Sequence, residues 1–211
     1  MTILIRCSSL ANIMASPTAA AIKAGEVLSV GAKTYLKQLA KEEVYGFQKY
    51  ISTKPMRKGI ECEQDGIELY NHCFFETLTK NQERRSTDLI TGEADLIAPN
   101  RGVDIKLPWS LSTFPALPED ADSYEWQARG YMHLWDLPRW DIAFCMVDTP
   151  DELIGYESED EHKVSHIDPH LRVTVVTYLR DMEKEALMLD KAAAAQKFVA
   201  EEIQRIRDYH A

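Results

Sequence analysis

The sequence predicts an α/β domain in which helices flank a mixed, twisted sheet. Apolar residues alternate along 140–147, as they do in a buried strand, and the β-branched run 172–177 indicates another strand. A turn rich in Pro, Asn and Gly at 99–102 separates two short strand-type segments and so predicts a hairpin. From 178 to 209 the apolar residues recur at helical spacing. Alternating strand and helix patterns in one chain favour an α/β fold.

Helices account for much of the remaining chain. The pair Ser16-Pro17 indicates the start of a helical region that extends to about Tyr50, with a break near 25–31. Residues 51–58 are expected to form a loop, and a helix is expected over 59–79.

The second half of the chain contains two loop-rich stretches. Three prolines between 108 and 122 exclude a long helix there. The helix that contains Gln127 is expected to end before Pro138. Residues 148–168 are acidic and mostly polar, and we expect a flexible surface loop to which the sequence assigns no function.

The hairpin carries the most informative residues. If its loop is even in length and Ala98 lies opposite Val103, then Asp95 lies opposite Lys106. Opposite residues point to the same side of a sheet, and successive residues alternate sides. The charged face then consists of Glu93, Asp95, Asp104 and Lys106, with Ile97 as its apolar exception, and the apolar face of Leu96, Ala98, Val103, Ile105 and Leu107.

This charged face predicts a metal site. Two carboxylates at one place repel each other unless a cation joins them, and oxygen ligands suit Mg²⁺ or Mn²⁺. A lysine beside them can position or deprotonate a water, or neutralise charge on a phosphate. A plain surface hairpin with a salt bridge is the alternative, and the hairpin residues alone do not decide between the two.

Neighbouring motifs decide in favour of the metal site. Asp95 followed by Asp104-Ile105-Lys106 resembles the signature of the PD-(D/E)xK nucleases. The chain departs mildly from that pattern, because Asp104 stands where many relatives have glutamate and Leu107 where many have cysteine. The shorter acid is expected to preserve metal ligation.

Two helical motifs flank the hairpin in the order found in this family. Upstream, the segment 59–70 resembles the motif helix of the phage exonuclease branch, and the matching residues are Gly59, Glu63, Gly66 and Tyr70. Downstream, Gln127 and Tyr131 resemble the Gln-x-x-x-Tyr helix of RecB-type nucleases, and at this spacing they share a helix face.

The N-terminal segment 5–14 resembles the opening of phage-encoded lambda-exonuclease-like proteins. In those proteins an arginine and serines contact the terminal phosphate of the DNA. Arg6 and either Ser8 or Ser9 are the matching residues here. Either serine could instead cap the helix that follows.

The resemblance implies a restriction-endonuclease-like fold in a single domain over 1–211. Its parts would be N-terminal helices at 1–58, a catalytic core at 59–147, and a C-terminal strand and helix at 170–210. The implied activity is Mg²⁺-dependent hydrolysis of linear double-stranded DNA from the 5′ end, with Mn²⁺ as a substitute. The implied setting is phage or prophage recombination by single-strand annealing in the cytoplasm of a bacterial host. A ring trimer and a phage single-strand annealing protein are the implied partners.

The same resemblance assigns roles to residues. Asp95 and Asp104 are expected to ligate the metal, together with the Ile105 carbonyl. Glu63 is expected at a second ion or to bind through water. We further expect Lys106 to orient or activate the attacking water, Gln127 to hold Lys106 or the motif loop, and Tyr131 to pack or to contact the DNA backbone.

Composition sets further limits. The four cysteines form no Cys-x-x-Cys pair, which argues against zinc, a disulfide framework and a clustered iron–sulfur site. No apolar run approaches the length of a membrane span, and Ile3-Leu4-Ile5 is too short for the core of a signal peptide. The net charge of −10 is unusual for a protein that binds DNA. Local basic clusters offer candidate contacts at Lys54, Arg57 and Lys58, and at Arg84 and Arg85.

Two alternatives stay open on sequence grounds. One is another nuclease on the same fold, either a site-specific endonuclease or a RecB-like single-strand nuclease. The other is a DNA-binding protein that kept the fold without activity. The intact set of Glu63, Asp95, Asp104 and Lys106 counts against the second, because a binding module has no need of a repulsive acid cluster.

Overall fold

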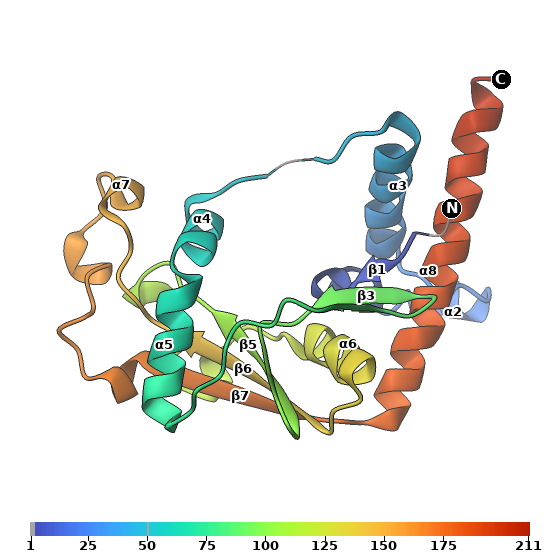
Figure 1. Cartoon of the computed structure of the whole chain (residues 1–211). Coiled ribbons are helices and arrows are strands. Elements are labelled where there is room, and N and C mark those ends of the chain that lie inside the picture. The colour runs from blue at the N-terminus through green and yellow to red at the C-terminus, as the bar shows by residue number, and fades with distance from the viewer. Residues whose placement is uncertain (1–2, 50) are drawn as a thin grey trace.

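The computed structural model describes residues 3–49 and 51–211 and contains two mixed sheets with helices around them (Figure 1). One sheet has β3 (Ile90–Glu93) at its centre, parallel to β1 (Ile5–Arg6) and antiparallel to β2 (Arg84–Ser86). The other has the order β4 (Leu96–Ala98), β5 (Arg101–Lys106), β6 (Arg139–Cys145) and β7 (Val173–Leu179), with β5 and β6 parallel. The predicted α/β class is confirmed, although the strands form two sheets where one was predicted.

The division between the sheets falls at Ala94 and Asp95. The backbone N–H of Asn81 donates to the Asp95 carbonyl at 2.7 Å, and its side-chain amide donates to the Ala94 carbonyl at 3.1 Å. Because Asn81 occupies these two acceptors, β3 ends at Glu93 and a new strand begins at Leu96. The break leaves Asp95 just outside the first residue of β4.

The hairpin is tighter than predicted. Its turn consists of Pro99 and Asn100 alone, so Ala98 pairs with Arg101 and Leu96 with Val103. The predicted pairing of Ala98 with Val103 is therefore wrong by two residues. Side chains alternate with a period of two, so an even shift leaves the residues of β4 and β5 on their predicted faces.

Helices cover both faces of the second sheet. Helix α5 (Glu63–Phe74) packs through Ile67 against Val103 and Ile105. Helix α6 (Glu125–Trp135) packs on the opposite face, where the rings of Tyr131 and Trp140 lie 4.9 Å apart. Asp104 pairs in register with Ile142 and so faces α6.

The helix predicted over 59–79 is divided into two. Helix α4 (Lys54–Glu61) begins inside the predicted loop, because Thr53 caps its N-terminus and Pro55 occupies its first turn. Cys62 has φ −110° and separates α4 from α5. A Cβ at Gly66 would lie 2.6 Å from the Leu107 side chain, so glycine lets α5 approach β5 closely.

The N-terminal and C-terminal helices lie together on the opposite side of the molecule from α4 and α5 (Figure 1). Helix α3 (Val30–Tyr45) packs against α8 (Met182–Tyr209), and α1 (Ala11–Met14) contacts both. The predicted helix start at Ser16 is wrong. Helix α2 (Ala19–Lys23) begins after Thr18, whose hydroxyl accepts a hydrogen bond from the Ala21 N–H.

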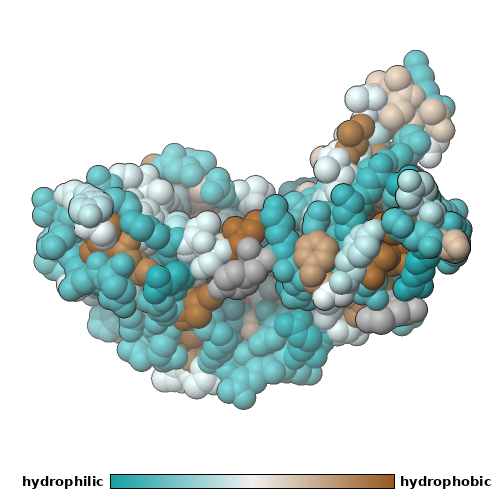
Figure 2. Space-filling view, turned by 90° about the horizontal axis from the view of Figure 1, so that it is seen from above, coloured by the Kyte–Doolittle hydropathy of each residue, from teal (hydrophilic) through white to brown (hydrophobic). Residues whose placement is uncertain are grey.

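Hydrogen bonds within the acidic segment 148–168 join its two ends, whereas the sequence predicted a flexible surface loop. It contains α7 (Asp151–Ile154), and the Asp148 carboxylate accepts N–H bonds from Val164 at 2.6 Å and Ser165 at 2.9 Å. None of the helices described here is both long and apolar enough to cross a membrane. Figure 2 shows a largely hydrophilic face on which hydrophobic atoms form separate small areas.

Gly102 provides a test of the packing between β5 and β6. A Cβ at this position would lie 2.1 Å from the Trp140 ring, and a buried ring cannot move without disturbing its neighbours. Gly102→Ala should therefore lower the free energy of unfolding by about 1–3 kcal/mol, measured as a lower urea midpoint. Gly31→Ala in the first turn of α3 is the control, because the added methyl meets only ordinary contacts and alanine favours helix. A Gly102→Ala midpoint equal to that of the control would contradict the close packing.

Candidate active site

Residues from four separate segments meet in one pocket of about 440 Å³. Strand β5 provides Asp104, Ile105 and Lys106, and α5 provides its first residue, Glu63. The remaining predicted residues that line it are Asp95, just before β4, and Gln127 and Tyr131 of α6. The structure thus brings together all residues of the three motifs that were predicted to act in chemistry.

Two carboxylates form the centre of the pocket. Asp104 is 2% exposed, and the Asp95 carboxylate accepts a hydrogen bond from the Ile105 N–H at 2.8 Å. Continuing the strand register by one residue places Asp95 opposite Asp104. The hairpin therefore pairs acid with acid, where the sequence predicted acid opposite lysine.

Lys106 and Gln127 compensate the charge of Asp104. The Lys106 ammonium lies 2.5 Å from one oxygen of Asp104, and the Gln127 amide donates to the other at 3.1 Å. The carbonyl oxygen of Gln127 also accepts from Lys106 at 3.4 Å. Gln127 thus contacts both members of the pair, as its predicted positioning role requires.

Burial and charge oppose each other in this cluster. Burial, followed by the negative charge of Asp104, raises the pKa of Asp95 above its ordinary value. Burial acts to lower the pKa of Lys106, but the charge and hydrogen bond of Asp104 outweigh it and raise that pKa. The surroundings of the pair thus disfavour a negative charge on Asp95 and favour the protonated form of Lys106 beside it.

The donor set fits a hard divalent cation. Asp95 and Asp104 offer oxygen ligands, and the Asp104 oxygen that Gln127 does not bind is the one paired with the Lys106 ammonium. Glu63 is turned aside, because its carboxylate forms an ion pair with Lys80. Across residues 3–49 and 51–211, no three His, Cys, Asp or Glu side chains already surround one point, and the pairing of Glu63 with Lys80 accounts for the missing third ligand.

Sequence analysis missed two contacts, that of Tyr124 with Lys106 and that of Lys80 with Glu63. The ring of Tyr124 lies under the Lys106 ammonium, whose nitrogen is 4.5 Å from the ring centroid. Lys80 forms an isolated bridge to Leu96, which places it beside Glu63 from a distant part of the chain. The position of Tyr124 just before the Gln127 helix was an available signal, whereas nothing in the sequence links Lys80 to Glu63.

Tyr131 is buried, and its position supports packing over contact with DNA. Its hydroxyl donates to the Glu93 carbonyl at 3.0 Å, and its ring packs with Trp135 and Trp140. Glu93 does not join the acid pair as the predicted face required, because its side chain extends to Arg84 at 2.9 Å in β2.

Arg6 and Ser8 line a smaller pocket of about 200 Å³, together with Arg84 and Glu93. Ser9 lines a different pocket, against α3, and Arg6 lines that pocket as well, so the arginine lies beside both candidate serines. Neither serine caps α1, since the residue before that helix is Leu10.

The predicted basic clusters are mostly neutralised. Lys58 is fully buried and cannot contact DNA from the surface. The other four side chains are ion-paired with acids, as Lys54–Glu157, Arg57–Glu61, Arg84–Glu93 and Arg85–Glu83.

The chain is similar to solved structures of exonucleases. It shares 32% identity and a TM-score of 0.91 with a phage-related exonuclease from Haemophilus somnus 129PT, over 98% of this chain and 97% of that one. It also resembles the alkaline exonuclease LHK-Exo from Laribacter hongkongensis, with 13% identity and a TM-score of 0.71 over 98% and 93% of the two chains. The complex of LHK-Exo with dAMP gives 15% identity and a TM-score of 0.68 at the same coverage. At these lower identities the likeness shows the fold alone. No model of a protein family and no curated protein sequence matches the chain.

The raised pKa of Asp95 predicts that metal binding releases protons. A carboxyl group that retains its proton near neutral pH loses it when a divalent cation binds. Calorimetric titration with Mg²⁺ at pH 7, in two buffers of different ionisation enthalpy, should therefore give different apparent heats. Glu93→Gln is the control, because this exposed acid lies outside the pair and should leave the proton release unchanged. Equal heats in both buffers for the unmutated protein would show that Asp95 is already ionised.

Proposed function

Because this chain belongs to the phage-related, lambda-exonuclease-like family of PD-(D/E)xK nucleases, we propose that it is a Mg²⁺-dependent DNA exonuclease. Its substrate is linear double-stranded DNA, which it hydrolyses from the 5′ end. It acts in phage or prophage recombination by single-strand annealing, in the cytoplasm of the bacterial host. The observation that carries this proposal is the convergence of Asp95, Asp104, Lys106 and Gln127 in one pocket.

The two aspartates hold the cation in this proposal. Asp95 and Asp104 would provide carboxylate oxygens and the Ile105 carbonyl a further ligand, and Glu63, which is paired with Lys80, would hold a second ion or bind through water. Mn²⁺ has the same preference for oxygen and can substitute. A bound cation supplies Lewis acidity, which polarises the scissile phosphate and makes an attacking water more acidic.

Lys106 acts on the attacking water and on the charge of the phosphate. Its ammonium is fixed by Asp104, Gln127 and the ring of Tyr124, so its three contacts leave little freedom of orientation. A positioned cationic donor stabilises the negative charge that develops as the phosphodiester is attacked. Gln127 is a positioning residue here, because it contacts Asp104 and Lys106 and lies behind both.

The pocket of Arg6 and Ser8 is proposed to bind the 5′-terminal phosphate. An arginine can bind a phosphate through two parallel hydrogen bonds, and a terminal phosphate carries more charge than an internal one. Arg84 lines the same pocket and adds a second guanidinium, while Glu93 limits the net positive charge. Ser9 lines the adjacent pocket, which Arg6 also lines, and is the alternative hydroxyl.

Assembly and partnership follow from the family. We propose that the subunits form a ring trimer and that the enzyme works with a phage single-strand annealing protein. Light scattering after size-exclusion chromatography measures the first, and co-purification with the annealing protein measures the second.

The activity itself is tested by Mg²⁺-dependent digestion of linear duplex DNA labelled separately at each end. Early release of the 5′ label, with covalently closed circular DNA left intact, is expected. Cleavage of circular DNA would favour an endonuclease, and a preference for single strands would favour a RecB-like nuclease. No hydrolysis with any divalent metal would leave the DNA-binding alternative.

Removing either metal-binding aspartate should abolish this digestion. Losing about 4 kcal/mol of transition-state stabilisation corresponds to a rate about 1,000-fold lower, and we expect at least this loss for Asp95→Ala and Asp104→Ala. Lys106→Ala should lower the rate strongly while Mn²⁺ still binds. Far-ultraviolet circular dichroism confirms that each variant is folded. Full activity in either aspartate variant would overturn the metal site.

The terminal-phosphate pocket predicts a preference among DNA ends. Linear DNA with a 5′-phosphate should be degraded faster than the same DNA with a 5′-hydroxyl, and Arg6→Ala should remove this difference. Arg205→Ala is the matched control, because this arginine lies near the end of α8 and pairs with Glu202. Equal rates on both ends for the unmutated enzyme would remove the pocket from the proposal.

A further inference from the structure

Helix α4 is attached to the protein by a charged side chain. A surface helix is ordinarily held by an apolar stripe. In α4 the buried residue is Lys58, which is 0% exposed, whereas Met56 and Ile60 are 51% and 77% exposed. The attachment of α4 therefore depends on what the Lys58 ammonium binds.

The Lys58 ammonium binds the chain just beyond the catalytic strand. It donates to the carbonyls of Pro108 at 2.7 Å and Trp109 at 3.1 Å. These residues follow Lys106 and Leu107, so the bonds join α4 to the end of β5. Burial lowers the pKa of Lys58 to about 8, against the opposing negative charge of Asp148, so the interior opposes the charge of the ammonium.

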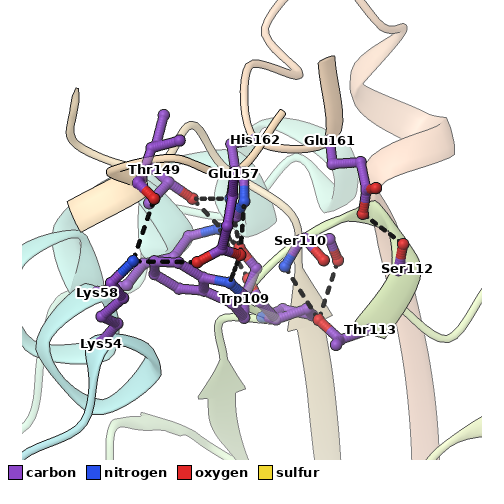
Figure 3. Close-up of polar contacts among 12 residues, drawn as sticks. Lys54, Lys58, Trp109, Ser110, Ser112, Thr113, Thr149, Glu157, Glu161 and His162 are labelled. Atoms are coloured by element: carbon purple, nitrogen blue, oxygen red, sulfur yellow. Dashed lines mark hydrogen bonds and ion pairs between the residues drawn. The ribbon is translucent and has the colours of Figure 1, made fainter. Parts of the chain in front are cut away.

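Trp109 is held from its other side by the segment 148–168 (Figure 3). Its indole N–H donates to Glu157 at 2.8 Å, and its carbonyl accepts from the Thr149 hydroxyl at 3.2 Å. The ring of His162 packs edge-on against the indole at 4.8 Å. Lys54 of α4 completes the enclosure by binding Glu157 at 3.0 Å. Trp109 is thus fixed between α4 and the acidic segment.

The position of α4 matters to the pocket for two reasons. Pro55, Met56 and Gly59 of α4 form one wall of the pocket that holds the aspartates. The helix also runs through Cys62 directly into α5, whose first residue is Glu63. A displacement of α4 would therefore move both this wall and the third acid.

We propose that Lys58 is a positioning residue for the active site. By binding α4 to the segment after β5, it sets the place of Glu63 relative to Asp95 and Asp104. This inference rests on the proposed nuclease function, and it assigns a role in that function to the segment 148–168 as the support of Trp109.

A second buried lysine provides a matched control. Lys191 is 5% exposed and donates to the carbonyls of Met14 at 2.8 Å and Ala15 at 2.9 Å. Lys58→Met and Lys191→Met therefore remove the same kind of interaction, an ammonium that donates to two carbonyls, although the Trp109 carbonyl keeps the Thr149 hydroxyl as a donor. Both variants should lose stability to a similar extent in thermal unfolding. Only Lys58→Met should affect the chemistry.

The experiment measures kcat on linear duplex DNA and the Mg²⁺ concentration at half-maximal rate, per folded molecule. Lys58→Met should lower kcat or raise that Mg²⁺ concentration by about 10-fold or more, the usual effect of losing a residue that supports metal ligands. Lys191→Met should match the unmutated protein in both. Equal values for the two variants would reduce Lys58 to a structural residue and overturn the proposal.

Two further measurements keep the test decisive. Mn²⁺ binding without DNA, followed by electron paramagnetic resonance, should weaken in Lys58→Met and stay unchanged in Lys191→Met. This arm remains valid if the unmutated protein proves not to cleave DNA, which would overturn the proposed function alone. If Lys58→Met does not fold, Lys58→Gln keeps one N–H donor and is judged by the same criteria.

Discussion

The carboxylates of Asp104, which is buried, and Asp95, which is half-buried, lie opposite each other across the hairpin, and the structure around them compensates their charge. Burial and mutual repulsion both favour the neutral acid, which is why the pKa of Asp95 is raised. The Ile105 N–H binds Asp95, while Lys106 and Gln127 bind Asp104. The first two come from β5 and the third from α6, so the charge of the acids is compensated where a strand and a helix distant in sequence pack together. A bound cation would also relieve the repulsion between the two acids, and this is the physical ground for the proposed metal site.

The sequence predicted which hairpin side chains share a face because side chains in a strand alternate with a period of two. The predicted hairpin register was wrong by two residues, since the turn is only Pro99 and Asn100. A register error of an odd number of residues would have predicted Asp104 on the apolar face. The error of two residues changed the predicted cross-strand neighbour of Asp104 but not its face. The spacing of a motif on a helix also indicates which residues share a face, and in the structure Gln127 donates a hydrogen bond to Asp104. The patterns thus defined which side chains share a face, whereas exact pairing depended on a turn that several lengths would have satisfied.

Features that depend on tertiary contacts were beyond pattern analysis. Lys58 looked like part of a basic surface cluster, because sequence composition cannot tell a buried ammonium from a solvated one. The apolar residues of α4, Met56 and Ile60, are exposed and its buried residue is a lysine, so a loop was expected where a helix is held by Lys58 and capped by Thr53. The pairing of Lys80 with Glu63 depends on the bend at Ala94 and Asp95, which Asn81 fixes from outside the strand. In each case a side chain binds a backbone group or a charged residue that lies close to it only in the folded chain.

The net charge of −10 also becomes intelligible once the basic side chains are placed. Those nearest the site are bound to acids, as in Lys54–Glu157, Arg57–Glu61 and Arg84–Glu93. Breaking such an exposed ion pair so that the basic side chain can bind a DNA phosphate costs little, because exposed ion pairs are worth about 0–1 kcal/mol. It also frees a carboxylate, which then repels the backbone of the DNA. DNA binding would gain most at a cation held by the active-site acids, because the cation balances the charge of the phosphate without freeing a carboxylate. For the proposed nuclease we therefore expect DNA binding to be concentrated at the active site and weak over the rest of the surface.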